Sequence, residues 1–328
     1  MRRKPRGRRR RLGGYRLPPI CRSSGLHAFR VDGLHAAAVA DVVHASQRVA
    51  IVTGAGRGLG RAYALALAAA GTAVVVNDTG TSGDGSGVEP AVATRVVDEV
   101  RAAGGLAIAN VDAVGTVAAG EALVAVAIAA FGRVDVLVNN AGISESHPID
   151  RFPAQAWDRI LAVHLTGTFA CARAAFATMR AAGRGGRIVN VTSGAGLDRA
   201  YPGTAAYAAA KGGIVSLTRV IAAEGAACGI TCNAVAPLAR TRMSARFLAD
   251  ATSPELDPAW VAPLIVYLAS AESAAVTGEV FRVRDGRLST VRLAPAEGVA
   301  PTGARWSAGE IAARIDDIRG PVDPRLPG

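Results

Sequence analysis

Short apolar runs alternate with long alanine-rich stretches along most of the chain, beginning at Arg48. The apolar runs predict strands at residues 48–54, 72–78, 106–110, 134–140, 186–193, 229–237 and 278–283. Their nearly unbroken apolar character is typical of strands that are covered on both faces. The stretches between them predict helices at about 59–70, 89–103, 116–131, 153–181, 204–227 and 258–269. This alternation predicts an α/β fold with one doubly wound parallel sheet of about seven strands.

The alternation is confined to residues 47–284, which we interpret as a single Rossmann-like domain. Residues 285–328 are turn-rich, with one weak helix expected near 307–318, and are interpreted as a C-terminal appendage. Residues 1–46 are basic, contain scattered proline and glycine, and lack apolar periodicity. We therefore expect a disordered extension there.

The net charge of +11 is concentrated in that extension. The first 30 residues hold 11 of the 37 basic residues and no acid, which leaves 26 basic against 26 acidic residues. The neutral remainder argues against a nucleic-acid partner for the domain. A targeting peptide, a nucleic-acid arm and an upstream artefact of the translation start all remain open for residues 1–46.

Membrane and metal sites are not expected. No run of 18 uninterrupted apolar residues suggests a spanning helix. The four cysteines, Cys21, Cys171, Cys228 and Cys232, lack a further Cys or His cluster at metal-ligand spacing. They are interpreted as reduced and structural in a cytoplasmic protein.

A glycine-rich turn, "TGAGRGLG" at 53–60, follows the first predicted strand. It fits the pattern T-G-x-x-x-G-x-G through Gly54, Gly58 and Gly60. Such glycines let the backbone approach a pyrophosphate at a helix N-terminus. Such glycines also occur merely to pack a helix on a sheet. The position of this motif directly after the first strand favours the pyrophosphate interpretation.

Two further motifs lie at expected strand ends. Asp78 ends the second strand, where a carboxylate accepts hydrogen bonds from an adenosine ribose and repels a 2′-phosphate, which favours NAD over NADP. Arg57 softens that preference, and an ordinary turn-forming Asp is the alternative. "NNAG" (139–142) ends the fourth strand, where Gly142 leaves room for a cofactor ring unless the motif is a simple turn.

"YAAAK" places Tyr207 and Lys211 about one helical turn apart. An ammonium about 4 Å from the phenol, at an effective dielectric near 20, interacts by roughly 4 kcal/mol. This predicts that Lys211 lowers the pKa of Tyr207 by up to about three units, making it an acid/base near neutral pH. Ser193, at the end of the fifth strand, is predicted to hydrogen-bond the same substrate oxygen, with an N-cap or turn role as the alternative.

These motifs together resemble the short-chain dehydrogenase/reductase family over residues 48–283. The resemblance implies hydride transfer between NAD and a secondary alcohol or ketone, and it implies a homodimer or homotetramer. It assigns catalysis to Ser193, Tyr207, Lys211 and His164. The cofactor-binding residues implied by it are Gly54, Arg57, Gly58, Leu59, Gly60, Asp78, Asp112, Asn139, Ala141, Gly142, Tyr207 and Lys211.

Within the family, "VVVNDTG", "ILAVHLTGTF", "CNAVAPLARTRM" and "PAWVAPLIVYLAS" are similar to the (3R)-hydroxyacyl-CoA dehydrogenase part of multifunctional enzyme type 2 and its stand-alone bacterial relatives. His164 stands where most of the family has Asn, either in a proton relay or as a satisfied buried residue. Ser193 lies 14 residues before Tyr207, one more than the usual family spacing, so either the segment between them carries an insertion or Gly194 takes the serine position.

The sequence thus predicts an NAD-dependent oxidoreductase of CH–OH groups, with a 3-hydroxyacyl-CoA as one candidate substrate. A sugar or steroid dehydrogenase of the same family and a non-catalytic NAD-binding regulator are the alternatives. Residues 143–152 and 238–257 are expected to line the substrate pocket.

Overall fold

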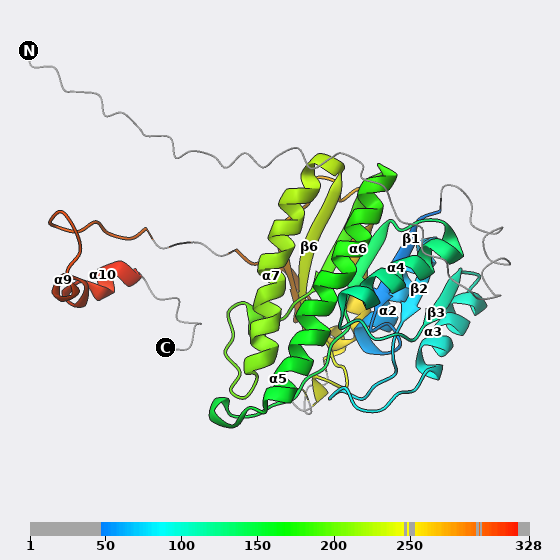
Figure 1. Cartoon of the computed structure of the whole chain (residues 1–328), viewed down its shortest axis with the longest axis horizontal. Coiled ribbons are helices and arrows are strands. Elements are labelled where there is room, and N and C mark those ends of the chain that lie inside the picture. Colours follow the sequence, from blue (N-terminus) through cyan, green and yellow to red (C-terminus); the bar gives the residue numbers. More distant parts are fainter. Residues whose placement is uncertain (1–46, 246–247, 249–252, 293–294, 296, 321–328) are drawn as a thin grey trace, which may run out of the picture. The chain divides into compact units, whose positions relative to one another are not determined.

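The computed structural model describes residues 47–245, 248, 253–292, 295 and 297–320 (Figure 1). The predicted basic extension at 1–46 lies outside these residues. The described chain forms an eight-stranded sheet in the order β3-β2-β1-β4-β5-β6-β7-β8. The strands are β1 Val49–Thr53, β2 Ala73–Asn77, β3 Ala107–Asn110, β4 Val136–Asn139, β5 Gly186–Val191, β6 Ile230–Pro237, β7 Val280–Arg284 and β8 Arg287–Thr290.

The first seven strands are parallel and coincide with the seven predicted ones, which confirms the doubly wound sheet. β8 is an addition: it pairs antiparallel with β7 and comes from the segment interpreted as an appendage. Every residue of β1, β2, β4 and β5 is buried, which explains their unbroken apolar sequences.

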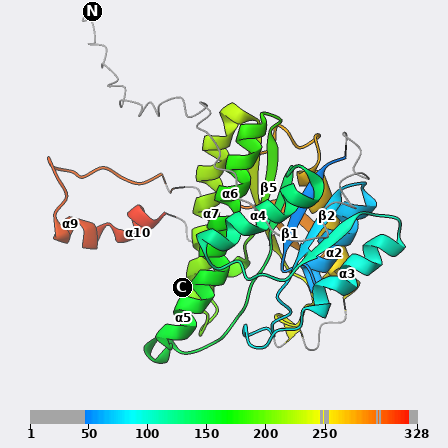
Figure 2. The same ribbon diagram turned by 45° about the vertical axis from the view of Figure 1, so that its right-hand side comes forward.

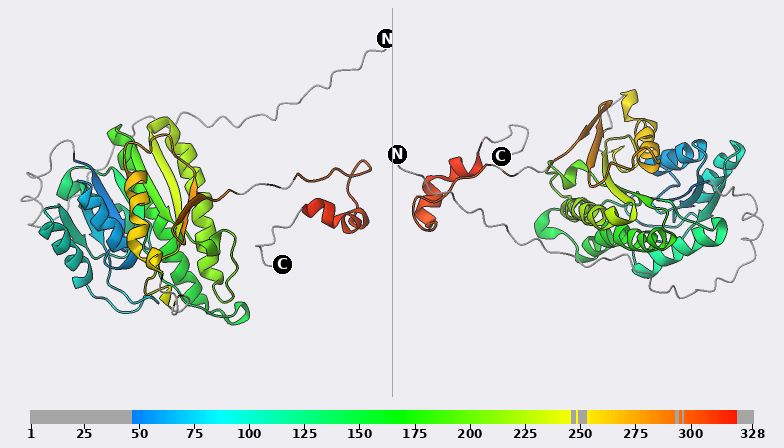
Figure 3. Two further views of the ribbon diagram at one scale, coloured as in Figure 1. Left: turned by 180° about the vertical axis from the view of Figure 1, so that it is seen from behind. Right: turned by 90° about the horizontal axis from the view of Figure 1, so that it is seen from above.

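Helices cover both faces of this sheet (Figures 2 and 3). One face packs against α2, α3 and α8, and the other against α4, α6 and α7. The bounds are α2 Gly58–Ala69, α3 Ala91–Ala102, α4 Val117–Phe131, α5 Ala154–Leu161, α6 Gly167–Ala182, α7 Ala205–Gly225 and α8 Ala262–Ala269. Beyond the sheet lie α9 Ala308–Ala313 and α10 Ile315–Arg319, where one helix was predicted.

The long helix predicted at 153–181 is interrupted. A π-helical turn, Ala162–Thr166, separates α5 from α6. By length and composition alone, the stretch Ala154–Ala182 is apolar enough to cross a membrane, but half of its most apolar window is buried. Cys171, Ala175 and Met179 of α6 belong to a buried core cluster that also contains residues of α4 and of the sheet. Packing in this core therefore explains why the stretch Ala154–Ala182 is apolar.

The strand order reverses between β1 and β4, which are neighbours in the sheet but far apart in the sequence. Chains that leave such a pair in opposite directions open a crevice at the carboxyl ends of the strands, where ligands of doubly wound sheets bind. Asp135 fixes this junction, because its carboxylate accepts the Val49 backbone N–H at 2.9 Å. The fold therefore places the ends of β1, β2, β4 and β5 around one crevice.

Candidate active site

The glycine turn between β1 and α2 is shaped by close backbone approaches. A side chain at Gly60 would place its Cβ 2.1 Å from the Gly54 carbonyl oxygen. Gly54 has a φ of +62° and itself faces the Ala141 backbone, 2.7 Å from a would-be Cβ. Arg57, the N-cap of α2, makes no side-chain capping bond. The turn thus packs closely against its own backbone and ends at the N-terminus of α2, whose first N–H groups have no partner within the helix and suit a pyrophosphate.

Asn140, which was not among the predicted site residues, supports this turn. Its Nδ2 donates to the carbonyls of Thr53 and Gly54, both at 3.0 Å. The Thr53 hydroxyl accepts the backbone N–H of Asn140 at 3.0 Å and that of Ala141 at 3.1 Å. The predicted residue Asn139 instead lies inside the sheet, where its side chain donates to Asn190 at 2.9 Å. The "NNAG" motif was the available signal, and the second asparagine is the one beside the turn.

Asp78 lies directly beside the glycine turn. Its Oδ2 accepts the Gly56 backbone N–H at 2.8 Å, and its Oδ1 accepts that of Gly80 at 2.7 Å. Both bonds fix the carboxylate at the end of β2. Asp112 follows the neighbouring β3 and accepts a hydrogen bond from Asn110 at 2.8 Å. The two predicted acids therefore lie at adjacent strand ends.

The four predicted catalytic residues come together at the end of β5. Ser193 is hydrogen-bonded to the Tyr207 side chain. The Lys211 Nζ lies 5.6 Å from the Tyr207 ring centroid and donates to the Val191 carbonyl at 2.7 Å. The ring of His164 meets that of Tyr207 edge-on, with centroids 5.1 Å apart. Ser193, not Gly194, thus reaches the tyrosine, so the extra residue of spacing is accommodated between them.

Ser193 also has the capping role that was its alternative interpretation. Its hydroxyl accepts the Ala195 backbone N–H at 3.3 Å at the start of a 3₁₀ turn, Gly194–Gly196. Gly196 packs against α7, where a Cβ would lie 2.4 Å from the Lys211 carbonyl carbon. This close contact seats the turn against the helix that carries Tyr207 and Lys211.

The expected effect of Lys211 on Tyr207 is not seen. Burial raises the pKa of the Tyr207 phenol, the Ser193 hydrogen bond opposes this rise, and Lys211 is not among the groups that shift it. Burial likewise lowers the pKa of Lys211 to about 7, because a 3% exposed ammonium loses its hydration. The prediction that Lys211 depresses the tyrosine pKa is therefore wrong for this structure, since it ignored the cost of burying both groups.

Lys211→Met is expected to stabilise the protein most at low pH. The folded pKa of Lys211, about 7, lies below its ordinary value of 10.5, so between these values the unfolded chain binds a proton that the folded chain does not. The free energy of unfolding of the wild type therefore rises with pH across this window, by about 1.4 kcal/mol per unit at most. The advantage of the methionine variant should be largest below pH 7 and shrink towards pH 10, as measured by urea unfolding.

Arg219→Met is the matched control, because it removes a cation from the same helix and arginine keeps its proton over this range. Its effect on the free energy of unfolding should not vary with pH between 7 and 10. An equally pH-independent effect of Lys211→Met would contradict the buried-lysine assignment.

His164 lies in the π-helical turn and is 1% exposed. Burial, with a further contribution from Lys211, lowers its pKa to about 3, which keeps the ring neutral near pH 7. Its Nε2 lies 3.0 Å from the Ile143 nitrogen and 2.6 Å from the Ile143 oxygen, while Nδ1 has no hydrogen-bond partner among the described residues. A Cβ at Gly142 would lie 2.3 Å from the ring. His164 therefore positions the loop that follows β4, and a proton relay through it stays a prediction.

The loop at 79–90 joins the two sides of the crevice. The Gly83 carbonyl accepts the Ser144 backbone N–H at 2.8 Å, in the segment predicted to line the substrate pocket. The Thr81 carbonyl accepts from Arg242 at 3.3 Å, in the other such segment. Part of that second segment, at 246–247 and 249–252, lies outside the described residues. The loop after β2 thus contacts both expected substrate-side segments.

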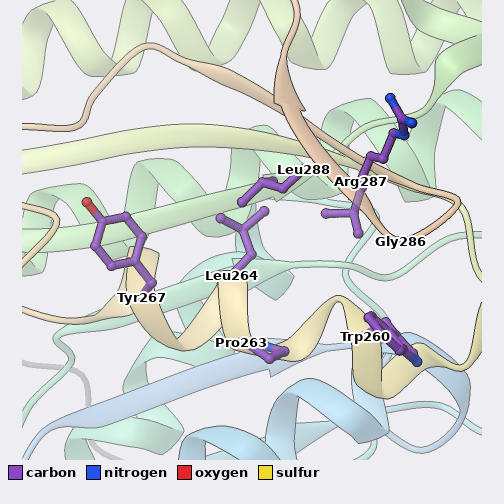
Figure 4. Close-up of a pocket in the computed structure, with 8 residues that line it drawn as sticks. Trp260, Pro263, Leu264, Tyr267, Gly286, Arg287 and Leu288 are labelled. Carbon is purple, nitrogen blue, oxygen red and sulfur yellow. The ribbon is translucent and has the colours of Figure 1, made fainter. Parts of the chain in front are cut away.

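An apolar cavity of about 270 Å³ lies elsewhere, between α8 and the β7–β8 hairpin (Figure 4). Its lining residues are Trp260, Pro263, Leu264, Tyr267, Val283, Gly286, Arg287 and Leu288. It contains none of the predicted site residues. No group of three or more potential metal ligands occurs among the described residues.

Comparison with known proteins identifies similar chains over most of the sheet domain. The family model for short chain dehydrogenases matches residues 48–251. A short chain dehydrogenase from Mycobacterium avium has a crystal structure that superposes with a TM-score of 0.75 at 43% identity, covering 85% of this chain and 97% of that one. The hydroxyacyl-CoA dehydrogenase ChsB1 of Mycobacterium tuberculosis is 36% identical over 85% of this chain and 90% of its own.

A second group of relatives is much longer than this chain. The peroxisomal multifunctional enzyme type 2 of Mus musculus is 44% identical over 245 residues, which are 75% of this chain but 32% of that protein. The chain therefore spans about a third of the length of that relative.

Proposed function

The chain belongs to the short chain dehydrogenase family, and we propose that it is an NAD-dependent oxidoreductase that interconverts a secondary alcohol and its ketone. The observation that carries this proposal is the meeting of Ser193, Tyr207 and Lys211 at the end of β5. A phenol that is hydrogen-bonded to a hydroxyl, with an ammonium nearby, is an arrangement suited to proton transfer.

The glycine turn fits a dinucleotide. Side chains at Gly54 and Gly60 would collide with the backbone around the turn, and the first turn of α2 carries no acidic residue to compete with a phosphate. Asp78 is placed to accept hydroxyl hydrogen bonds from an adenosine ribose, which supports NAD rather than NADP. NAD, when bound, supplies or accepts the hydride.

The residues of the chain handle the proton. In the alcohol-oxidising direction, the Tyr207 oxygen accepts the substrate hydroxyl proton while the carbinol carbon gives up its hydride. In the reducing direction, the phenol donates that proton to the ketone oxygen. Ser193 donates a hydrogen bond to the same substrate oxygen and stabilises its developing negative charge. Lys211 donates to the Val191 carbonyl beside Tyr207, and His164 holds the loop after β4 in place.

The raised pKa of the Tyr207 phenol predicts opposite pH dependences for the two directions. The phenol is the form that donates a proton to a ketone, and it persists into the alkaline range. Oxidation requires the form that accepts a proton, whose population grows with pH. We expect kcat/KM for oxidation to rise from pH 7 to pH 10, whereas kcat/KM for reduction should stay level or fall. A profile for oxidation that falls over this range would contradict Tyr207 as the base.

For the substrate we propose a 3-hydroxyacyl-CoA, supported by the name of the mycobacterial relative that the chain matches over most of both lengths. NADH formation should be measured with 3-hydroxyacyl-CoA thioesters of both configurations, sterols and polyols. Turnover of sterols or polyols alone would favour the alternative dehydrogenases. Tight NAD binding without turnover of any substrate would favour the non-catalytic regulator.

Three further predictions belong to the same proposal. The protein is cytoplasmic, it forms a homodimer or homotetramer, and its catalytic domain is bounded at residues 46 and 284. Cell fractionation, sedimentation and limited proteolysis of the full chain test them in turn.

A further inference from the structure

Two charged residues of opposite sign flank the position expected for the adenosine ribose. The carboxylate of Asp78 disfavours a 2′-phosphate there, whereas the guanidinium of Arg57, next to the glycine turn, would attract one. Sequence alone leaves this conflict open, because either charge could face the ribose. The structure resolves it through the contacts of the arginine.

Arg57 already contacts the loop that follows β2. Its Nη1 donates to the Gly80 carbonyl at 3.4 Å and to the Thr81 carbonyl at 3.3 Å, just beyond Asp78. Its Nη2 forms an ion pair with Glu89. The guanidinium therefore lies along the backbone that leaves β2, with its charge directed at a carboxylate.

Glu89 is held in this place by the closure of the loop at 79–90. Its backbone N–H donates to the Thr79 carbonyl at 3.2 Å. Gly80, with a φ of +74°, leaves no room for a side chain, because a Cβ would lie 2.1 Å from the Glu89 carbonyl oxygen. Arg95 of α3 adds a second ion pair to the Glu89 carboxylate at 2.7 Å. These contacts keep the carboxylate charged and beside Arg57.

We propose that Glu89 sets the coenzyme preference of this chain, by pairing with Arg57 and thereby withdrawing the cation that would otherwise bind a ribose 2′-phosphate. The inference rests on the proposed dinucleotide site and deepens it. Glu89 acts through Arg57 and through its own negative charge, and Asp78 supplies the remaining discrimination. Removing the Glu89 charge should therefore improve NADP binding without reversing the preference for NAD.

Glu89→Gln in the full chain tests the proposal. Because this ion pair is exposed and screened by solvent, we expect a modest effect: the Kd for NADP should fall by about fivefold, while that for NAD changes less than twofold. Isothermal titration with each dinucleotide measures this without any substrate. Arg57→Leu added to Glu89→Gln should remove most of the gain, because the freed guanidinium is its main source.

Glu99→Gln is the matched control, since Glu99 of α3 forms an exposed ion pair with Arg61 of α2. It removes the same charge and should leave the ratio of the two Kd values unchanged. An equal gain in NADP affinity from Glu99→Gln, or none from Glu89→Gln in a chain that binds NAD, overturns the inference and leaves the proposed function standing. Failure of the wild type to bind either dinucleotide overturns both.

Discussion

Replacing Tyr207 by phenylalanine is expected to lower kcat by a factor of about 10²–10⁴, the usual contribution of a positioned acid/base. The substitution removes only the oxygen that exchanges a proton with the substrate. The ring, which packs edge-on against His164, remains. NAD affinity should change little, because the glycine turn and Asp78 are untouched.

Tyr267→Phe is the control for loss of a tyrosine hydroxyl. Tyr267 lies on α8 beside the apolar cavity and is 39% exposed. Its substitution should leave both kcat and NAD affinity within a factor of about two, as is usual at surface positions. Turnover by Tyr207→Phe at wild-type rate would remove the basis of the proposed mechanism, whereas weak NAD binding by this variant would indicate a wider structural defect.

Gly60→Ala is expected to weaken NAD binding by roughly 100-fold, or about 3 kcal/mol. The new methyl group would lie 2.1 Å from the Gly54 carbonyl oxygen and 2.6 Å from the Asn140 side chain. Asn140 can rotate away, but the Gly54 oxygen belongs to the backbone of the turn. The turn must therefore open, which displaces the N–H groups that face the pyrophosphate. Titration with NAD and urea unfolding measure the two effects separately.

Gly309→Ala provides the comparison, because it adds the same methyl group to α9 where no atom lies within 4 Å. Alanine is also the better helix former, so this variant should retain NAD binding and lose no stability. If Gly60→Ala binds NAD as the wild type does, the glycine turn is not the pyrophosphate site.

The sheet was predictable because its central strands are buried on both faces and their sequences carry that burial directly. β8 was missed because its four residues are all exposed and carry no such pattern. A local signal was nevertheless present: Asp285 and Gly286 have φ values of 52° and 70°, and an Asp-Gly pair between strands is typical of a two-residue hairpin. The π-helical turn at His164 has no comparable signal, since it depends on the packing of α5 and α6 against their neighbours.

The residues of the site were predictable from their motifs, but the pKa values of their side chains were not. The spacing of Tyr207 and Lys211 indicated that they are neighbours, whereas their pKa shifts depend on burial, which spacing does not reveal. Composition held one further clue. Lys211 is the only lysine beyond residue 4 in a chain with 37 basic residues, and arginine stands at every other basic position beyond residue 4. An ammonium that can lose its proton when buried explains that choice.

The pairing of β1 with β4 also has a consequence for biosynthesis. Ile51 lies beside Leu137, so a ribosome must complete the first half of the domain before β1 acquires its second neighbour. Until then, an apolar strand edge is open to pairing with other nascent chains. Aggregation during expression should therefore be most severe for fragments that end before residue 136, and slower translation just beyond β4 should improve the yield of the full chain.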